Sequence, residues 1–250
     1  KMLDLLKRLC NIDATSGDEN AVRDFIISEI DGFCDWKTDN LGNIIAFKKG
    51  KKTPTRKLMI DAHMDEVGFI ITSVTADGFL KFQTVGGIET AVLLARRVIT
   101  ESGVKGVISM KPVHLLSSSE KTKQPDADSL YIDIGATDKD DALNYVSLGD
   151  IGTFASHWAE LGESLVRSKA LDDRVGCATL ISLLKADAEY DFYATFTFGE
   201  EIGLRGAKTA AFTVSPDAAV ILEATTAADL YGVSNDKKVC CLGLGPAISF

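Results

Sequence analysis

Four short stretches of the sequence place histidine or carboxylate side chains beside apolar runs. The residues concerned are His63 and Asp65, Asp172 and Asp173, Glu200 and Glu201, and Glu223. An ionisable group at the end of a buried strand loses hydration, which is costly unless a partner compensates for the loss. The nature of that partner decides what chemistry these residues can do.

The spacing of the four stretches favours a metal as the partner. In open α/β sheets ligands bind in the crevice beyond the carboxyl ends of the strands, so we expect these side chains to meet at one sheet edge. Five or more carboxylates in one crevice repel each other strongly unless cations are present. One imidazole with several carboxylates suits Zn, Co or Mn better than Ca or Mg.

The adjacent pair Glu200 and Glu201 can divide two tasks. Neighbouring side chains diverge, so one carboxylate can bind metal while the other accepts a proton from water. Two metals about 3.5–4 Å apart, bridged by one carboxylate, can activate water and polarise a carbonyl together. The bridging role suits an aspartate near a helix N-terminus, which is Asp172.

Each stretch also has a structural interpretation without a metal. His63 taken alone is typical of a hydrogen-bonded structural histidine, and Asp172-Asp173 is typical of a helix N-cap. Glu200-Glu201 fits the exposed first turn of a helix, whereas Glu223 at the end of an apolar run fits a surface position least well. The joint occurrence at equivalent strand ends is what favours the metal site.

The elements that must position these residues alternate between helix and strand at both ends of the chain. Apolar spacing predicts an N-terminal helix with Met2, Leu3, Leu5, Leu6 and Leu9 on one face, and a second helix with Val22, Phe25, Ile26 and Ile30 buried. Ser16–Glu19 is interpreted as a capping region. Asp61 and Glu66 are interpreted as strand-end or supporting polar groups. The remaining expected elements are a strand into Phe47, strands at 58–60, 192–198 and 218–224, helices at 172–186 and 204–212, and a strand begun at 246–250.

Between these α/β parts the sequence is mostly β. Alternating residues around Asp77-Gly78 predict a hairpin, and residues 117–129 predict a mobile polar loop. The interruption predicts an outer domain of residues 1–68 and 166–250 with an inserted β domain of residues 69–165. A single continuous α+β domain is the alternative.

Composition bounds the class of protein. The 250 residues are 46% hydrophobic and carry a net charge of -9, which disfavours a nucleic-acid partner. No apolar run approaches the ~20 residues that a membrane-spanning helix needs. The five cysteines have no disulfide-scaffold or CxxC spacing, which favours reduced thiols in a cytoplasmic protein.

Several ordered motifs together resemble the M42 family of metallo-aminopeptidases, of the glutamyl- and deblocking-aminopeptidase type. The motifs are "TSGDE", "IDAHMDEVGF", "KALDDRVGC" and "FGEEIGLRGA", with "KPVHLL" and "LGPAISF" in support. The resemblance implies an α/β fold with a zinc-peptidase-like three-layer catalytic domain and an inserted small, PDZ-like β-barrel. It further implies two divalent metal ions per subunit, Zn or Co, peptide substrates cleaved at their N-terminus, and homo-oligomers from dimers to tetrahedral dodecamers.

The resemblance also implies roles for individual residues. They are His63 as a ligand of one metal, Asp172 as the bridge, Glu200 as the general base, Glu201 and Glu223 as ligands of different metals, and Asp65 as the carboxylate that orients the imidazole. Asp173 and Arg174 match the motif without an assigned role, and we expect them to support the site.

This sequence departs from the family pattern at two points. Glu223 stands where the family often has aspartate. The family has a further histidine ligand in a C-terminal segment, whereas this chain ends at Phe250, and its other histidines, His114 and His157, fall in the β insertion. We therefore expect a part of a longer enzyme with a weakened second metal site.

Two other functions stay open from the sequence. An endoglucanase-type glycoside hydrolase would use a carboxylate pair, but it has no need of His63, and aromatic residues for stacking sugars make up only 8% of the chain. The other is a catalytically impaired assembly subunit.

Overall fold

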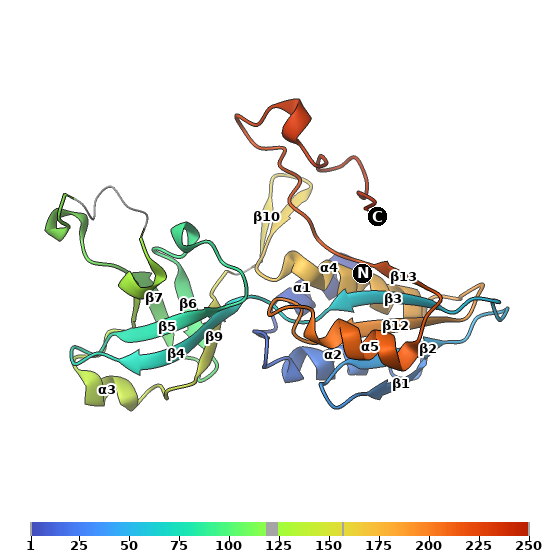
Figure 1. Ribbon diagram of the computed structural model, residues 1–250, viewed down its shortest axis with the longest axis horizontal. Coiled ribbons are helices and arrows are strands. Elements are labelled where there is room, and N and C mark those ends of the chain that lie inside the picture. Colours follow the sequence, from blue (N-terminus) through green and yellow to red (C-terminus); the bar gives the residue numbers. More distant parts are fainter. Residues whose placement is uncertain (1, 119–124, 157, 250) are drawn as a thin grey trace.

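The computed structural model describes residues 2–118, 125–156 and 158–249. Figure 1 shows a β-barrel beside a mixed sheet that is covered by helices. The helices are α1 (Met2–Cys10), α2 (Asn20–Ile30), α3 (Lys139–Leu143), α4 (Leu171–Lys185) and α5 (Arg205–Val214). The strands are β1 (Asp35–Thr38), β2 (Ile44–Lys48), β3 (Leu58–His63), β4 (Gly68–Val74), β5 (Leu80–Val85), β6 (Arg97–Thr100), β7 (Lys105–Ser109), β8 (Tyr131–Asp133), β9 (Ile151–Phe154), β10 (Ala159–Leu161), β11 (Leu165–Arg167), β12 (Phe192–Thr197) and β13 (Ala218–Ile221).

The sheet has the strand order β1-β2-β12-β3-β13. Strands β12 and β13 each pair with β3 in parallel, whereas β2 is antiparallel to β12. The carboxyl ends of β3, β12 and β13 therefore meet at one edge, as the sequence predicts for the polar stretches.

Apolar residues of the helices cover both faces of this sheet. On one face α1, α2 and α4 pack together, and Leu9, Ile26 and Ile181 are fully buried there. On the other face Val214 of α5 packs with Ile45 and Met59. Burying such side chains stabilises the fold by roughly 1.5–3 kcal/mol each.

The second part is a closed barrel of six strands in the order β4-β5-β8-β7-β6-β9. Its own core includes Phe69, Leu80, Val98 and Ile132. Strands β4 and β5 form the predicted hairpin, and Gly78 at its turn has a φ of +83°, which glycine adopts without steric cost.

Some local predictions are wrong. Met2 and Leu3 are exposed because only one side of α1 faces the core. Residues 246–249 form no strand, because no neighbouring strand pairs with them and Ile248 remains exposed. Part of the loop predicted at 117–129, residues 119–124, lies outside the described residues.

The capping prediction at the start of α2 is also wrong. Glu19 occupies the N-cap position, but its side chain makes no capping hydrogen bond, because its oxygens accept hydrogen bonds from Gly17 and Gly199 instead. Within the described part of the chain, no helix is long and apolar enough to cross a membrane.

Candidate active site

The edge where the parallel strands end collects the predicted site residues. His63 is the last residue of β3, Glu200 and Glu201 lie in the loop from β12 to α5, and Glu223 lies just beyond β13. Asp172 comes from the start of α4, which packs against β3. Parallel pairing therefore brings together residues that are up to 160 positions apart in the sequence.

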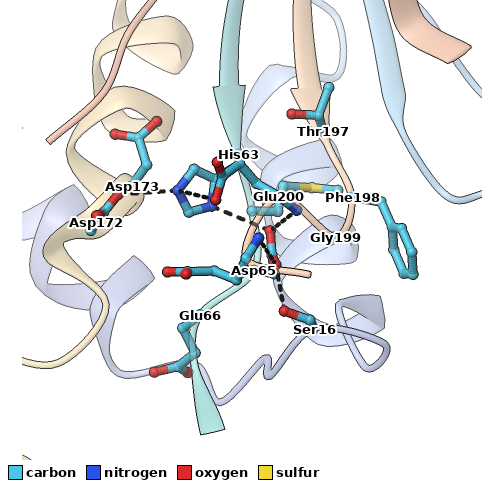
Figure 2. Close-up of polar contacts among 12 residues, drawn as sticks. Ser16, His63, Asp65, Glu66, Asp172, Asp173, Thr197, Phe198, Gly199 and Glu200 are labelled. Carbon is cyan, nitrogen blue, oxygen red and sulfur yellow. Dashed lines mark hydrogen bonds and ion pairs between the residues drawn. The ribbon is translucent and has the colours of Figure 1, made fainter. Parts of the chain in front are cut away.

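Figure 2 shows His63 in contact with Asp172 on one side and Asp65 on the other. The side chain of His63 is almost fully buried. Its Nε2 atom lies 3.1 Å from Asp172 Oδ1, 3.5 Å from Glu223 Oε1 and 4.0 Å from Glu200 Oε2. One ring nitrogen can donate only one hydrogen bond, so it cannot satisfy three carboxylates. The arrangement needs further positive charge.

The other ring nitrogen of His63 faces Asp65. Nδ1 lies 3.2 Å from Asp65 Oδ1, but the contact lacks the geometry of a hydrogen bond. Burial alone would lower the pKa of His63, whereas the contacts with Asp172, Asp65 and Glu223 raise it well above its ordinary value. When no other cation is present, the imidazole therefore favours its protonated form, but this single charge does not balance all the carboxylates around it.

Asp65 is fully buried and anchors the loop that carries the two glutamates. Its Oδ1 accepts from the backbone amide of Glu200 at 3.0 Å, and its Oδ2 accepts from the amide of Glu201 at 3.1 Å. Ser16 donates to Oδ2 at 2.6 Å (Figure 2). Burial alone would raise the pKa of Asp65, but the contacts from His63, Ser16 and the Glu200 amide lower it, so the carboxylate stays ionised.

The donor set fits divalent metal ions. Two groups of side chains within the described residues bring their ligand atoms within 4.8 Å of one another: His63, Asp172 and Glu223, and His63, Glu200 and Glu201. Both combine one imidazole with two carboxylates, a set typical of zinc and related transition metals. Burial raises the pKa of Glu201 to about 7. The crowded carboxylates explain why a cation is needed.

Asp172 and Asp173 have different surroundings. Asp172 is half exposed and turns toward His63, whereas Asp173 is fully buried and accepts from the amide of Gly176 at 2.9 Å. Asp173 has non-helical backbone angles and caps the helical turn that follows it, whereas Asp172 makes no such bond. Burial raises the pKa of Asp173 to about 8.

Arg174 and Glu66 join the segments beneath the site. Arg174 is fully buried and donates from Nε to the carbonyl of Met64 at 2.8 Å. Glu66 accepts from the amide of Ala14 at 3.0 Å and from Thr153 of the barrel at 3.2 Å. These contacts tie α4 and the segment after β3 to the N-terminal segment and the barrel.

Asp61 also has a supporting place, but inside β3 rather than at its end. It is buried and accepts hydrogen bonds from Thr195 and Thr197 of the neighbouring strand. Burial raises the pKa of Asp61 to about 6. Neither group of candidate metal ligands includes it.

Sequence reasoning missed Ser16, Glu19 and Asn43 as parts of the site's support. The motif "TSGDE" contains the first two, but the sequence pattern around it predicts a helix cap. Glu19 is buried, which raises its pKa to about 7. Of the other histidines, His114 is in the short 3-10 turn Val113–Leu115 and joins neither ligand group, and His157 lies outside the described residues.

Comparison with known proteins decides the family. The sequence profile of the M42 glutamyl aminopeptidases matches residues 42–250. The chain belongs to this family. This M42 chain is 40% identical over 250 residues to a putative aminopeptidase of Acetivibrio thermocellus, covering 99% of the chain and 72% of the relative. These matches confirm the predicted resemblance. At the level of the family they also confirm the predicted function, a metal-dependent aminopeptidase.

Other relatives carry more specific names. The lysyl aminopeptidase of Pyrococcus furiosus is 32% identical, with 98% of this chain and 72% of the relative covered. The glutamyl aminopeptidase of Lactococcus lactis is also 32% identical, with 100% of this chain and 73% of the relative covered. The chain thus spans about 70% of the length of these proteins.

Solved structures share the fold. Aminopeptidase APDkam598 of Desulfurococcus kamchatkensis superposes with a TM-score of 0.91 at 37% identity, covering 98% of this chain and 69% of that one. A protein of Thermotoga maritima described as an endoglucanase gives a TM-score of 0.82 at 38% identity, with 98% and 73% covered. The TET1 peptidase of Pyrococcus horikoshii gives a TM-score of 0.80 at 35% identity, covering 92% of this chain and 72% of that one. That protein is described as assembling into a tetrahedron or a large octahedral shell.

Proposed function

We propose that this chain removes N-terminal residues from peptides with two divalent metal ions, Zn or Co, as cocatalysts. The convergence of three carboxylates on Nε2 of His63 carries the proposal, because it creates a site that needs cations. Membership of the M42 family supports peptides as the substrates.

In this proposal the metal ions would be held by His63, Asp172, Glu201 and Glu223, and Asp172 would be shared between them. Asp172 suits the shared role because its side chain is half exposed and one of its carboxylate oxygens lies 3.1 Å from Nε2 of His63. When bound, such ions polarise a carbonyl and lower the pKa of water. Asp65 orients the His63 ring and holds the backbone of Glu200. In this proposal it is not itself a metal ligand.

Glu200 acts as the general base. Its carboxylate lies 4.0 Å from Nε2 of His63, and its amide is fixed by Asp65. Burial raises the pKa of Glu200, and this favours a group that accepts a proton from the attacking water and returns it to the leaving amine.

The test measures hydrolysis of aminoacyl-anilides by the chain with Zn or Co added, before and after chelation. We expect chelator-sensitive hydrolysis, and a decrease in kcat of about 100- to 10,000-fold in Glu200→Gln with metal still bound. Unchanged hydrolysis in this variant would refute the assignment of the base, and absence of hydrolysis in the wild type would favour the inactive assembly subunit.

An endoglucanase is a second candidate because one structural relative is described as an endoglucanase and another as a putative peptidase/endoglucanase. Retaining and inverting glycosidases need two carboxyl groups and no imidazole ligand. The endoglucanase would be supported over the peptidase if the chain released reducing sugar from cellulose in the presence of a chelator and did not cleave aminoacyl-anilides.

We also propose the architecture and assembly that the family resemblance implies. The catalytic domain comprises residues 1–68 and 166–250 with zinc-peptidase-like layering, and residues 69–165 form an inserted, PDZ-like domain. The protein forms homo-oligomers and functions in the cytoplasm. The name of the TET1 relative supports assembly, which sedimentation of the purified chain would test.

A further inference from the structure

Four consecutive backbone amides in the loop between β12 and α5 donate to buried side chains from distant parts of the sequence. Phe198 donates to Asn43 Oδ1 at 2.8 Å, and Gly199 donates to Glu19 Oε1 at 3.1 Å. Asp65 accepts from the next two amides, those of Glu200 and Glu201. The loop that presents both glutamates is thus held at each of these four residues by side chains from outside it. Figure 2 shows the contact of Asp65 with Glu200.

Asn43 is fully buried and closes the base of this loop. Besides accepting from Phe198, its Nδ2 donates to the carbonyl of Gly206 at 3.1 Å, where α5 begins. Nδ2 also contacts Asp39 and Thr209 at 2.7 Å each. One side chain therefore ties the first residue of the loop and the first turn of α5 to the turn before β2.

Glu19 holds the loop from the side of α2. Its Oε1 accepts from Gly199, and its Oε2 accepts from Gly17 at 3.0 Å, so both oxygens are used and it makes no capping bond. Gly199 has a φ of +61°, a conformation that side-chain-bearing residues rarely adopt. The Glu19 bond thus holds the residue directly before Glu200 in an unusual conformation.

We propose that Glu19 and Asn43 are positioning residues that keep Glu200 and Glu201 directed toward His63. Neither side chain reaches the candidate metal ligands, so both act through the amides of Phe198 and Gly199. The inference rests on the proposed function, because that function makes Glu200 of this loop the general base and Glu201 a metal ligand. A buried amide that loses its acceptor is costly, so the loop is expected to shift when either residue is replaced.

The experiment compares Glu19→Gln and Asn43→Ala with the wild-type chain. Glutamine keeps the size of Glu19 but has only one acceptor oxygen for two amides. Binding of Co is followed by its visible absorption spectrum, and we expect its affinity to decrease about 10- to 100-fold with an altered spectrum. If a variant fails to fold, Thr209→Val removes only one contact of Asn43, and we expect a smaller change in the same direction.

Asp191→Asn is the matched control. Asp191 is also a buried carboxylate that accepts from a loop amide, that of Gly50 at 2.8 Å, but it lies before β12, at the opposite end of the strand from Glu200. We expect this variant to lose stability in urea without any change in Co affinity or spectrum. A Co affinity and spectrum unchanged in both Glu19→Gln and Asn43→Ala would overturn the proposal.

Hydrogen exchange of the metal-free chain distinguishes a failure of this inference from a failure of the proposed function. We expect the amides of residues 198–201 to exchange faster in both variants, and not in Asp191→Asn. A wild-type chain that binds no Co would contradict the proposed function, while exchange at these amides would still report whether Glu19 and Asn43 hold the loop. Unchanged exchange at 198–201 would overturn the positioning role whatever the wild type binds.

Discussion

The carboxylate of Asp65 accepts a hydrogen bond from the backbone amide of Glu200 at 3.0 Å. The same carboxylate faces Nδ1 of His63 at 3.2 Å. Asp65 therefore fixes the backbone of the proposed base as well as the ring of the proposed ligand. A carboxylate that only oriented the imidazole would leave the glutamate loop unaffected when replaced.

Replacement of Asp65 by asparagine tests this double role. The amide nitrogen of asparagine cannot accept from the Glu201 amide, and the negative charge beside His63 is lost. We expect metal affinity and kcat/KM to decrease about 10- to 100-fold, measured by Co titration and anilide hydrolysis. Ser16→Ala is the control, since it removes only the 2.6 Å bond to Oδ2 and should have a smaller effect. Equal losses in the two variants would contradict the double role.

Addition of metal is expected to stabilise the folded chain. A ligand that binds only the folded state stabilises it by about 2.7 kcal/mol when its free concentration is about 100 times the Kd. The unfolding midpoint should therefore rise with added Zn and fall again on chelation. His63→Ala removes the residue common to both ligand groups and should abolish the rise. A rise of equal size in His63→Ala would place the binding of metal elsewhere.

The stability of the helical layer should depend on pH through Glu29. Glu29 of α2 pairs with Arg8 of α1 at 2.8 Å and with Lys185 of α4. The hydrogen bond from Lys185 is the main cause that lowers the pKa of Glu29 below its ordinary value of 4.5. A lowered pKa in the folded state gives stability that is present above 4.5 and is lost as the pH falls further.

We therefore expect Glu29→Gln to lower the free energy of unfolding by about 0.2–1 kcal/mol for each ion pair at neutral pH. In acid, where Glu29 of the wild type becomes protonated, the variant and the wild type should have the same free energy of unfolding. Urea unfolding at a series of pH values measures it, with the exposed Glu160→Gln as the control. A difference from wild type that stays constant from neutral to acid pH would show that Glu29 acts only by packing.

Gly86 is expected to matter because it brings a barrel loop against the site. A Cβ atom there would lie 2.7 Å from Val67 Cγ1 and 3.3 Å from Cβ of Glu201, and Gly86 has a φ of +87°. We expect Gly86→Ala to cost about 1–2 kcal/mol of stability from the backbone alone and to reduce anilide hydrolysis. Its neighbour Gly87 has no atom within 4 Å of such a Cβ, so Gly87→Ala should change little. Similar activity in both variants would show that the barrel loop does not constrain Glu201.

The sequence by itself determined the elements and the residue types of the candidate site. Apolar periodicity marked β3, β12 and α4, since burial imposes a local pattern on strand and helix. The position of His63, Glu200 and Glu223 after apolar runs then predicted one sheet edge, because parallel strands end together. Ordered motifs predicted the family.

Only the tertiary structure decided which polar residues work together. Asn43, Glu19 and Asp65 are separated from the loop at 198–201 by more than 130 positions, and each contact depends on how β2, β3 and the turn before α2 pack. Local sequence favoured a helix cap for Glu19, but Gly199 needed an acceptor once the loop was buried against it. Likewise the buried capping role of Asp173 and the half-exposed place of Asp172 follow from the path of the chain into α4, because adjacent aspartates look alike in sequence.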